Sequence, residues 1–235
     1  MSLLHRPRVR RLLDRWFLNA VPTCTNCVAL TFDDGPNPRN TPPLLDLLER
    51  KGIVATFFLI GRHVRRHPEL ARDIHARGHE IANHTDQHMP LPLLPRRFVD
   101  QQIRRAERAI VEATGSRPRF LRPPMGWFSA RVLDQIGEAG YVPVIGSVHP
   151  RDSRQPRVET IVERVRPRID DGAIVILHDG GWHARVDRSN TIEAVDRLTD
   201  EWLAEGRQLV TLSAMTGRDD VPTPPRNGPA TPDRD

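Results

Sequence analysis

Short apolar runs alternate along the chain with longer amphipathic stretches. The apolar runs predict strands at residues 28–32, 55–60, 80–83, 119–122, 142–145, 173–177 and 208–212. The stretches between them predict helices at residues 42–51, 68–77, 95–114, 129–139, 158–170 and 191–205. Strict alternation with short loops is typical of parallel strands joined by helical crossovers. About seven such units in one domain predict an α/β fold, and a barrel rather than an open sheet.

We divide the chain into three parts. Residues 1–27 form a basic segment in which a short amphipathic helix is predicted, and a weak peripheral contact with a membrane is the alternative. Residues 28–217 form the α/β domain. Residues 218–235 are rich in Pro, Asp and Arg and are predicted to be a disordered tail. The predicted N-terminal helix rests on the helical spacing of Leu12, Leu13, Trp16 and Phe17.

The N-terminus lacks the continuous apolar core of about 7–15 residues that a signal peptide requires. No run of about 18 apolar residues occurs, so no transmembrane span is predicted. The compartment is left open.

Composition argues against a nucleic-acid partner and does not decide the state of the two cysteines. The net charge is +5, but 30 acidic residues are interleaved with the arginines, and no stacked-aromatic motif accompanies them, so we predict no nucleic-acid binding. The two cysteines, Cys24 and Cys27, supply half of the ligands that a structural zinc needs. They are interpreted as incidental thiols or a local disulfide.

Polar residues follow several of the predicted strands. Asp33 and Asp34 come directly after the first strand, where Gly35 and Pro36 force a turn. Taken alone, this pair is also ordinary turn chemistry, because Asp caps its own backbone. In a barrel, however, the chemistry collects at the strand C-termini, where Asp33 and Asp34 are predicted to lie.

Three H-x-x-x-H pairs compete as metal ligands: His63/His67, His75/His79 and His84/His88. Pro68 interrupts any helix that carries the first pair, and the second pair lies at the opposite end of the strands. The third pair directly follows the strand at residues 80–83, on the same edge as Asp33 and Asp34. One carboxylate with two imidazoles is a recognised set for a divalent metal with open positions.

Two more strand ends add polar groups to this edge. The fourth predicted strand runs into Arg122 and the sixth into His178. The four motifs occur in order at residues 31–36 (TFDDGP), 84–88 (HTDQH), 122–126 (RPPMG) and 176–179 (ILHD). Over roughly residues 28–216 the chain resembles the polysaccharide deacetylase family, the NodB homology domain of carbohydrate esterase family 4.

This resemblance implies a distorted (β/α) barrel, one divalent metal, usually zinc, and hydrolysis of N-acetyl groups on amino-sugar glycans. Cobalt, nickel or manganese are alternatives to zinc. By resemblance, the metal ligands would be Asp34, His84 and His88. The partner would be an N-acetylated glycan, and we predict a monomer.

The resemblance also implies the catalytic roles. Asp33 would be the general base, oriented by Arg122, and His178 the general acid to the leaving amine. The backbone N–H of Met125 would stabilise the oxyanion. Trp127 and Leu177 would form part of the apolar pocket for the acetyl methyl group.

The chain departs from the family pattern at two places. Met125 stands where an aromatic residue is common. The family has a further motif in which an aspartate stands beside a tryptophan, and in the nearest stretch, residues 147–153, Ser153 follows Asp152 where tryptophan is common. Asp152 is the predicted partner of His178. His149 is either a substitute contact or a residue of the rim, and the sequence does not decide between them.

Three alternatives to N-deacetylation stay open. The same residues suit an O-acetyl esterase on a polysaccharide. A glycosidase fits poorly, because its two carboxyl groups flank the sugar about 5–9.5 Å apart, whereas Asp33 and Asp34 are neighbours on one turn. An inactive sugar-binding domain would have no use for a base and an acid beside the metal ligands.

Overall fold

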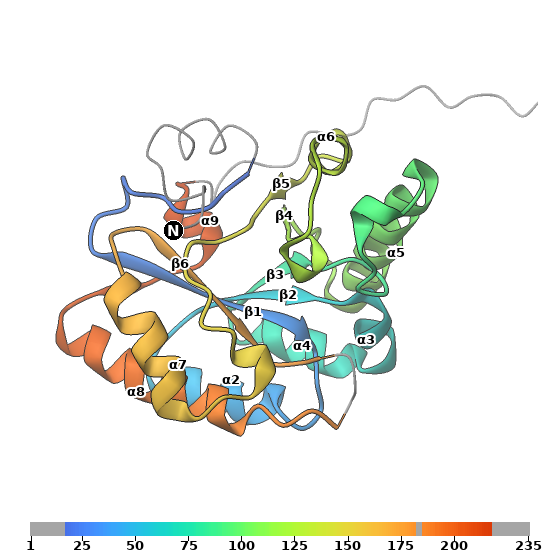
Figure 1. Cartoon of the computed structure of the whole chain (residues 1–235). Coiled ribbons are helices and arrows are strands. Elements are labelled where there is room, and N and C mark those ends of the chain that lie inside the picture. The colour runs from blue at the N-terminus through green and yellow to red at the C-terminus, as the bar shows by residue number, and fades with distance from the viewer. Residues whose placement is uncertain (1–16, 182–184, 218–235) are drawn as a thin grey trace, which may run out of the picture.

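The computed structural model describes residues 17–181 and 185–217 (Figure 1). All seven predicted strands occur, and they form one parallel sheet in the order β5-β4-β3-β2-β1-β6, with β7 paired to β1. The strands are β1 (Cys27–Gly35), β2 (Thr56–Leu59), β3 (Glu80–Asn83), β4 (Phe120–Leu121), β5 (Val142–Pro143), β6 (Ala173–His178) and β7 (Gln208–Leu209).

The two outermost strands of this order are joined by an irregular segment. Beyond β5, Val148 forms a parallel bridge with Val175 of β6. The backbone N–H of Ile176 donates to the carbonyl of Val148 at 2.9 Å. This contact brings the β5 side of the sheet back to β6, and the predicted distorted α/β barrel is confirmed.

Helices cover the outside of the sheet, and α2, α7 and α8 lie together beneath β1 and β6 in Figure 1. The α-helices are α2 (Thr41–Arg50), α3 (Gly61–Arg66), α4 (Pro68–Ala76), α5 (Arg96–Thr114), α6 (Ala130–Glu138), α7 (Val158–Val165), α8 (Ser189–Ala204) and α9 (Leu212–Met215). Short 3-10 turns are η2 (Leu91–Leu93), η3 (Pro124–Gly126), η4 (Asp152–Arg154) and η5 (Arg166–Arg168).

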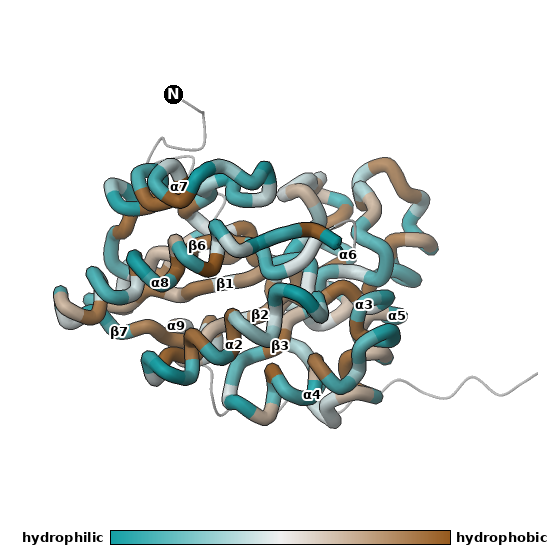
Figure 2. The backbone as a smooth tube through the Cα atoms, turned by 90° about the horizontal axis from the view of Figure 1, so that it is seen from below, coloured by the Kyte–Doolittle hydropathy of each residue, from teal (hydrophilic) through white to brown (hydrophobic). Residues whose placement is uncertain are grey.

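Alternation along the strands separates two apolar clusters. Leu30 and Phe32 of β1 pack with helix residues such as Trp202 in the larger cluster. Ala29 of β1 packs instead with Phe58 in the second cluster. Figure 2 shows hydrophobic positions concentrated along the central strands, whereas the covering helices carry both hydrophobic and hydrophilic positions. Because side chains alternate along a strand, Asp33 shares the inward face with Ala29.

Several predicted boundaries were wrong for local reasons. The predicted helix 158–170 ends at Val165, because Pro167 cannot continue it and lies instead in the 3-10 turn Arg166–Arg168. The predicted strand 208–212 ends at Leu209, since the Thr211 side chain caps α9 by accepting from the N–H of Ala214. Helix α3 was not predicted, and β4 and β5 are shorter than predicted.

The predicted N-terminal helix falls mainly on residues outside the described part, as does the predicted tail 218–235. Phe17, which is described, is buried with its ring centroid 5.1 Å from that of Phe128. Cys24 and Cys27 form a disulfide. Within residues 17–181 and 185–217, no helix has the length and apolarity to cross a membrane.

Candidate active site

The two neighbouring carboxylates at the end of β1 reach the same cavity because the strand is bulged there. The register with β2 passes from Asp33 opposite Phe58 to Gly35 opposite Leu59, so Asp34 is the extra residue. Its φ of 72° lies in the left-handed region. Adjacent residues of a regular strand point to opposite faces, and a bulge re-aims one of them. Both side chains therefore line one cavity.

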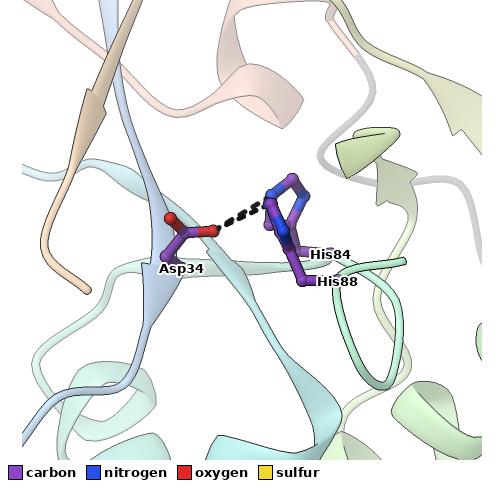
Figure 3. Close-up of side chains that lie close together, drawn as sticks. All are labelled: Asp34, His84 and His88. Carbon is purple, nitrogen blue, oxygen red and sulfur yellow. Dashed lines mark ion pairs between the residues drawn. The ribbon is translucent and has the colours of Figure 1, made fainter. Parts of the chain in front are cut away.

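Asp34, His84 and His88 come together as predicted (Figure 3). Asp34 Oδ1 lies 3.4 Å from His84 Nε2 and 3.2 Å from His88 Nε2. The histidines stand four residues apart on a loop rather than a helix, and positive φ at Thr85 and His88 folds that loop tightly. One carboxylate oxygen and two imidazole nitrogens thus converge on one point.

The backbone around these side chains fixes their orientation. His84 Nδ1 lies 2.8 Å from the carbonyl oxygen of Arg122, to which it donates, so its Nε2 keeps a lone pair toward Asp34. His63 Nδ1 makes the same kind of contact, 2.9 Å from the carbonyl oxygen of Asp34 itself. Gly180 also packs here, because an added Cβ would lie 2.0 Å from that carbonyl oxygen.

The side chains of Asp34, His84 and His88, which we call the triad, suit a divalent metal. Asp34 Oδ1 is buried and accepts no well-formed hydrogen bond from a described residue. Burial raises the pKa of Asp34, but the polar contact with His84 and the charges of His178, His84 and His88 outweigh it and hold the pKa below its ordinary value. Burial and the charge of His84 lower the pKa of His88 to about 4. An ionised carboxylate and a neutral imidazole are the states that bind metal.

A buried ion pair stands beside the triad. Arg122 Nη1 donates to Asp33 Oδ1 at 2.5 Å and to Thr31 Oγ1 at 2.9 Å, and the guanidinium lies 4.0 Å from the centre of the Phe58 ring. The other oxygen of Asp33 lies 4.0 Å from His84 Nε2. The pair therefore orients one carboxylate oxygen toward the triad.

A second pair, His178 with Asp152, lies across the cavity. His178 Nδ1 is 2.9 Å from Asp152 Oδ1, and the backbone N–H of His178 donates to Oδ2 at 2.9 Å. Thr191 donates its hydroxyl to the same Oδ2 at 3.1 Å. Burial lowers the pKa of His178, but the charge and hydrogen bond of Asp152 outweigh it and raise the pKa to about 9. His178 is thus set up as a proton donor.

The remaining predicted residues occupy different positions relative to the cavity, which has a volume of about 590 Å³. Met125, Trp127 and His149 line it. Met125 sits in η3 with φ of 60°, and its backbone N–H donates to no other described residue. Leu177 does not line the cavity. It is fully buried in the larger apolar cluster, and Ile176 contributes the apolar side chain instead.

Sequence reasoning missed two of these contacts. His63 was set aside because Pro68 interrupts its helix, and the chain does break there, at His67 between α3 and α4. No spacing signal could have predicted that His63 binds a backbone carbonyl. Ile176 could have been found, because it lies two residues before His178 and so shares its face of the strand.

Comparisons with known proteins agree with this geometry. The family described as "Polysaccharide deacetylase" matches residues 20–144. A peptidoglycan-N-acetylglucosamine deacetylase of Bacillus cereus is 39% identical over 197 residues, which are 83% of this chain and 90% of that protein. A chitooligosaccharide deacetylase of Sinorhizobium fredii is 41% identical over 192 residues, covering 77% of this chain and 89% of that protein.

A similar fold occurs in a crystal structure. The Bc1960 peptidoglycan N-acetylglucosamine deacetylase, in complex with 4-naphthalen-1-yl-N-oxidanyl-benzamide, matches with a TM-score of 0.80 and 29% identity. The match covers 85% of this chain and 92% of that one.

Proposed function

The chain belongs to the polysaccharide deacetylase family, and from that premise we infer that it is a metal-dependent hydrolase that removes N-acetyl groups from amino-sugar glycans. The substrates named for its relatives are peptidoglycan N-acetylglucosamine and chitooligosaccharides. One observation carries the inference: a carboxylate and a histidine, each held by its own buried partner, line the same cavity as the Asp34–His84–His88 triad.

Asp34, His84 and His88 would hold the metal, and we propose zinc, with cobalt, nickel or manganese as alternatives. Two imidazoles and one carboxylate suit zinc when further positions stay open for water and substrate. When bound, such an ion lowers the pKa of water and polarises the acetyl carbonyl.

The residues of this chain would handle the protons. Asp33 takes a proton from water as the water oxygen attacks the acetyl carbon, and Arg122 pairs with Asp33 and orients it. The N–H of Met125 donates to the developing oxyanion. His178 then gives its proton to the nitrogen as the C–N bond breaks, which releases acetate and a free amine. Met125, Trp127 and Ile176 supply apolar surface around the acetyl group.

An O-acetyl esterase is the second candidate function, because attack by water is common to both reactions. The observation that favours an amide is His178, whose raised pKa keeps a proton available for a poor leaving group. Acetate release should be measured on a chitin oligomer, an N-acetylated peptidoglycan glycan and an O-acetylated xylan, each with and without a chelator. Chelator-sensitive release from the N-acetylated substrates is expected, and release from xylan alone would replace the proposal with the esterase.

His84→Ala and His88→Ala are each expected to lose the bound metal, because a site with two protein ligands binds far more weakly than one with three. The purified wild-type chain should carry about one divalent ion, which elemental analysis of the folded proteins measures. His75→Ala is the matched control, since His75 is exposed at the end of α4 and belongs to another H-x-x-x-H pair. Unchanged metal content in both site variants would refute the ligand assignment.

Asp152→Asn is expected to move the alkaline limb of the pH profile to lower pH. A raised pKa keeps His178 protonated until the pH passes through about 9, so activity that needs this proton is lost above that value. Removal of the Asp152 charge leaves only the charges of Asp34 and Asp33 to oppose the effect of burial, so His178 then loses its proton at lower pH. The measurement is kcat against pH on a chitin oligomer, with the exposed Asp134→Asn as control. Superimposable profiles would contradict the pairing.

A further inference from the structure

Two arginines project from the turn that also carries Asp152. Arg151 caps η4 and Arg154 ends it. Both arginines line the active-site cavity and are exposed. Asp152, between them, is fully buried and points to His178. One turn therefore presents a carboxylate to the catalytic histidine and places two arginines at the cavity.

The surrounding structure holds this turn rigidly. The guanidinium of buried Arg188 donates to the carbonyl oxygens of Asp152 and Ser153 at 3.3 and 3.1 Å, and to that of Gly180 at 2.8 Å. Arg151 and Gln155 flank the turn with φ of 61° and 55°. Non-glycine residues keep such conformations only where their surroundings enforce them. The backbone that carries Arg151 and Arg154 is thus held in place before any ligand binds.

Neither guanidinium has a partner among the described residues, in contrast to arginines elsewhere on the surface. Arg77, Arg166 and Arg197 each bind a carboxylate of a neighbouring helix. Arg151 and Arg154 make no ion pair or side-chain hydrogen bond with residues 17–181 or 185–217. A planar guanidinium matches a carboxylate with two parallel hydrogen bonds. The turn therefore offers an unused anion site at the rim of the cavity.

We propose that Arg151 and Arg154 bind a carboxylate on the sugar that neighbours the one being deacetylated. The enzyme would then prefer anionic N-acetylated glycans over neutral chitin oligomers. The expected position of this neighbouring sugar follows from the proposed function, on which this inference rests. The acetyl group lies at the metal triad and the amine leaves toward His178, so the rest of the glycan extends past His178. Asp152 links that histidine directly to the turn.

The test compares two tetrasaccharides that differ only in charge. In both, all sugars are N-acetylated and alternate sugars carry a lactyl ether. In one the lactyl group is a free carboxylate, and in the other it is the neutral methyl amide. The quantity measured is the ratio of kcat/KM for acid and amide, determined by acetate release from the metal-loaded full chain. We expect a ratio of about tenfold or more in the wild type, as for hydrogen bonds to charged groups. It should fall with added salt.

The double variant Arg151→Gln/Arg154→Gln is expected to bring this ratio close to one. The control is Arg104→Gln/Arg105→Gln on α5, which removes the same net charge from exposed positions that do not line the cavity. Equal ratios in the wild type and the double variant would overturn the inference, as would an equal fall in the control. Wild-type release from both tetrasaccharides at one rate would also overturn it while leaving the proposed function intact. Release from neither would reject the proposed function itself.

Discussion

Asp33→Asn is expected to lower kcat for N-acetyl hydrolysis by about 10²–10⁴-fold, the usual size of a general acid–base contribution. The substitution keeps the shape of the side chain but removes the charge and the basicity needed to accept a proton from water. Because the metal ligand is the neighbouring Asp34, the triad itself is unchanged. The loss should therefore appear in turnover with the metal still bound.

The measurement is kcat on a chitin oligomer, together with metal content and melting temperature, since Arg122 loses its buried charge partner. Asp179→Asn is the matched control. Burial raises the pKa of Asp179 to about 7, so that an amide resembles its neutral form, and Asp179 does not line the cavity. Near wild-type turnover in Asp33→Asn would remove the base role from this residue. An equal loss in both variants would point to a general effect of removing a buried carboxylate.

The sequence could predict the edge of the sheet at which the site lies, but not the backbone detail that completes it. Parallel strands place their carboxyl ends together, which was enough to predict that His84 and His88 meet the two aspartates of the first strand. The choice of Asp34 as the ligand came from the family resemblance. The bulge that turns both Asp33 and Asp34 to the cavity has no signature in the pattern, because an apolar run followed by Gly35 and Pro36 fits a regular strand equally well.

Contacts between residues far apart in the sequence could not be predicted from the pattern either. Asp152 was assigned to His178 by resemblance alone, since residue types do not encode a contact across 26 positions. Leu177 was predicted to line the pocket because the family motif was followed. The two-residue period of a strand would have indicated Ile176 instead, since it lies on the same face as His178. The boundary between α3 and α4 was also readable, from the steric effect of Pro68 on the preceding residue.

His178→Ala is expected to damage amide hydrolysis far more than hydrolysis of an activated ester. An amide nitrogen must be protonated before the tetrahedral intermediate can collapse to acetate and amine. The phenolate of an activated aryl acetate leaves without a proton. We therefore expect a loss of about 10²–10⁴-fold in kcat on a chitin oligomer and a loss below about tenfold on the aryl acetate. Asp33→Asn should reduce both activities, because both reactions begin with attack by water.

The two substrates are compared at the same metal loading, so that the ratio of losses reports the leaving group alone. His149→Ala is the matched control, since His149 lines the same cavity but burial and the charge of Arg122 lower its pKa. A neutral imidazole cannot protonate the amine, and the ratio of amide to ester activity should stay at its wild-type value in this variant. Equal losses on both substrates for His178→Ala would mean that this histidine acts through the oxyanion or the fold. The assignment of His178 as the acid would then be withdrawn, and the preference for amides over esters would lose its structural basis.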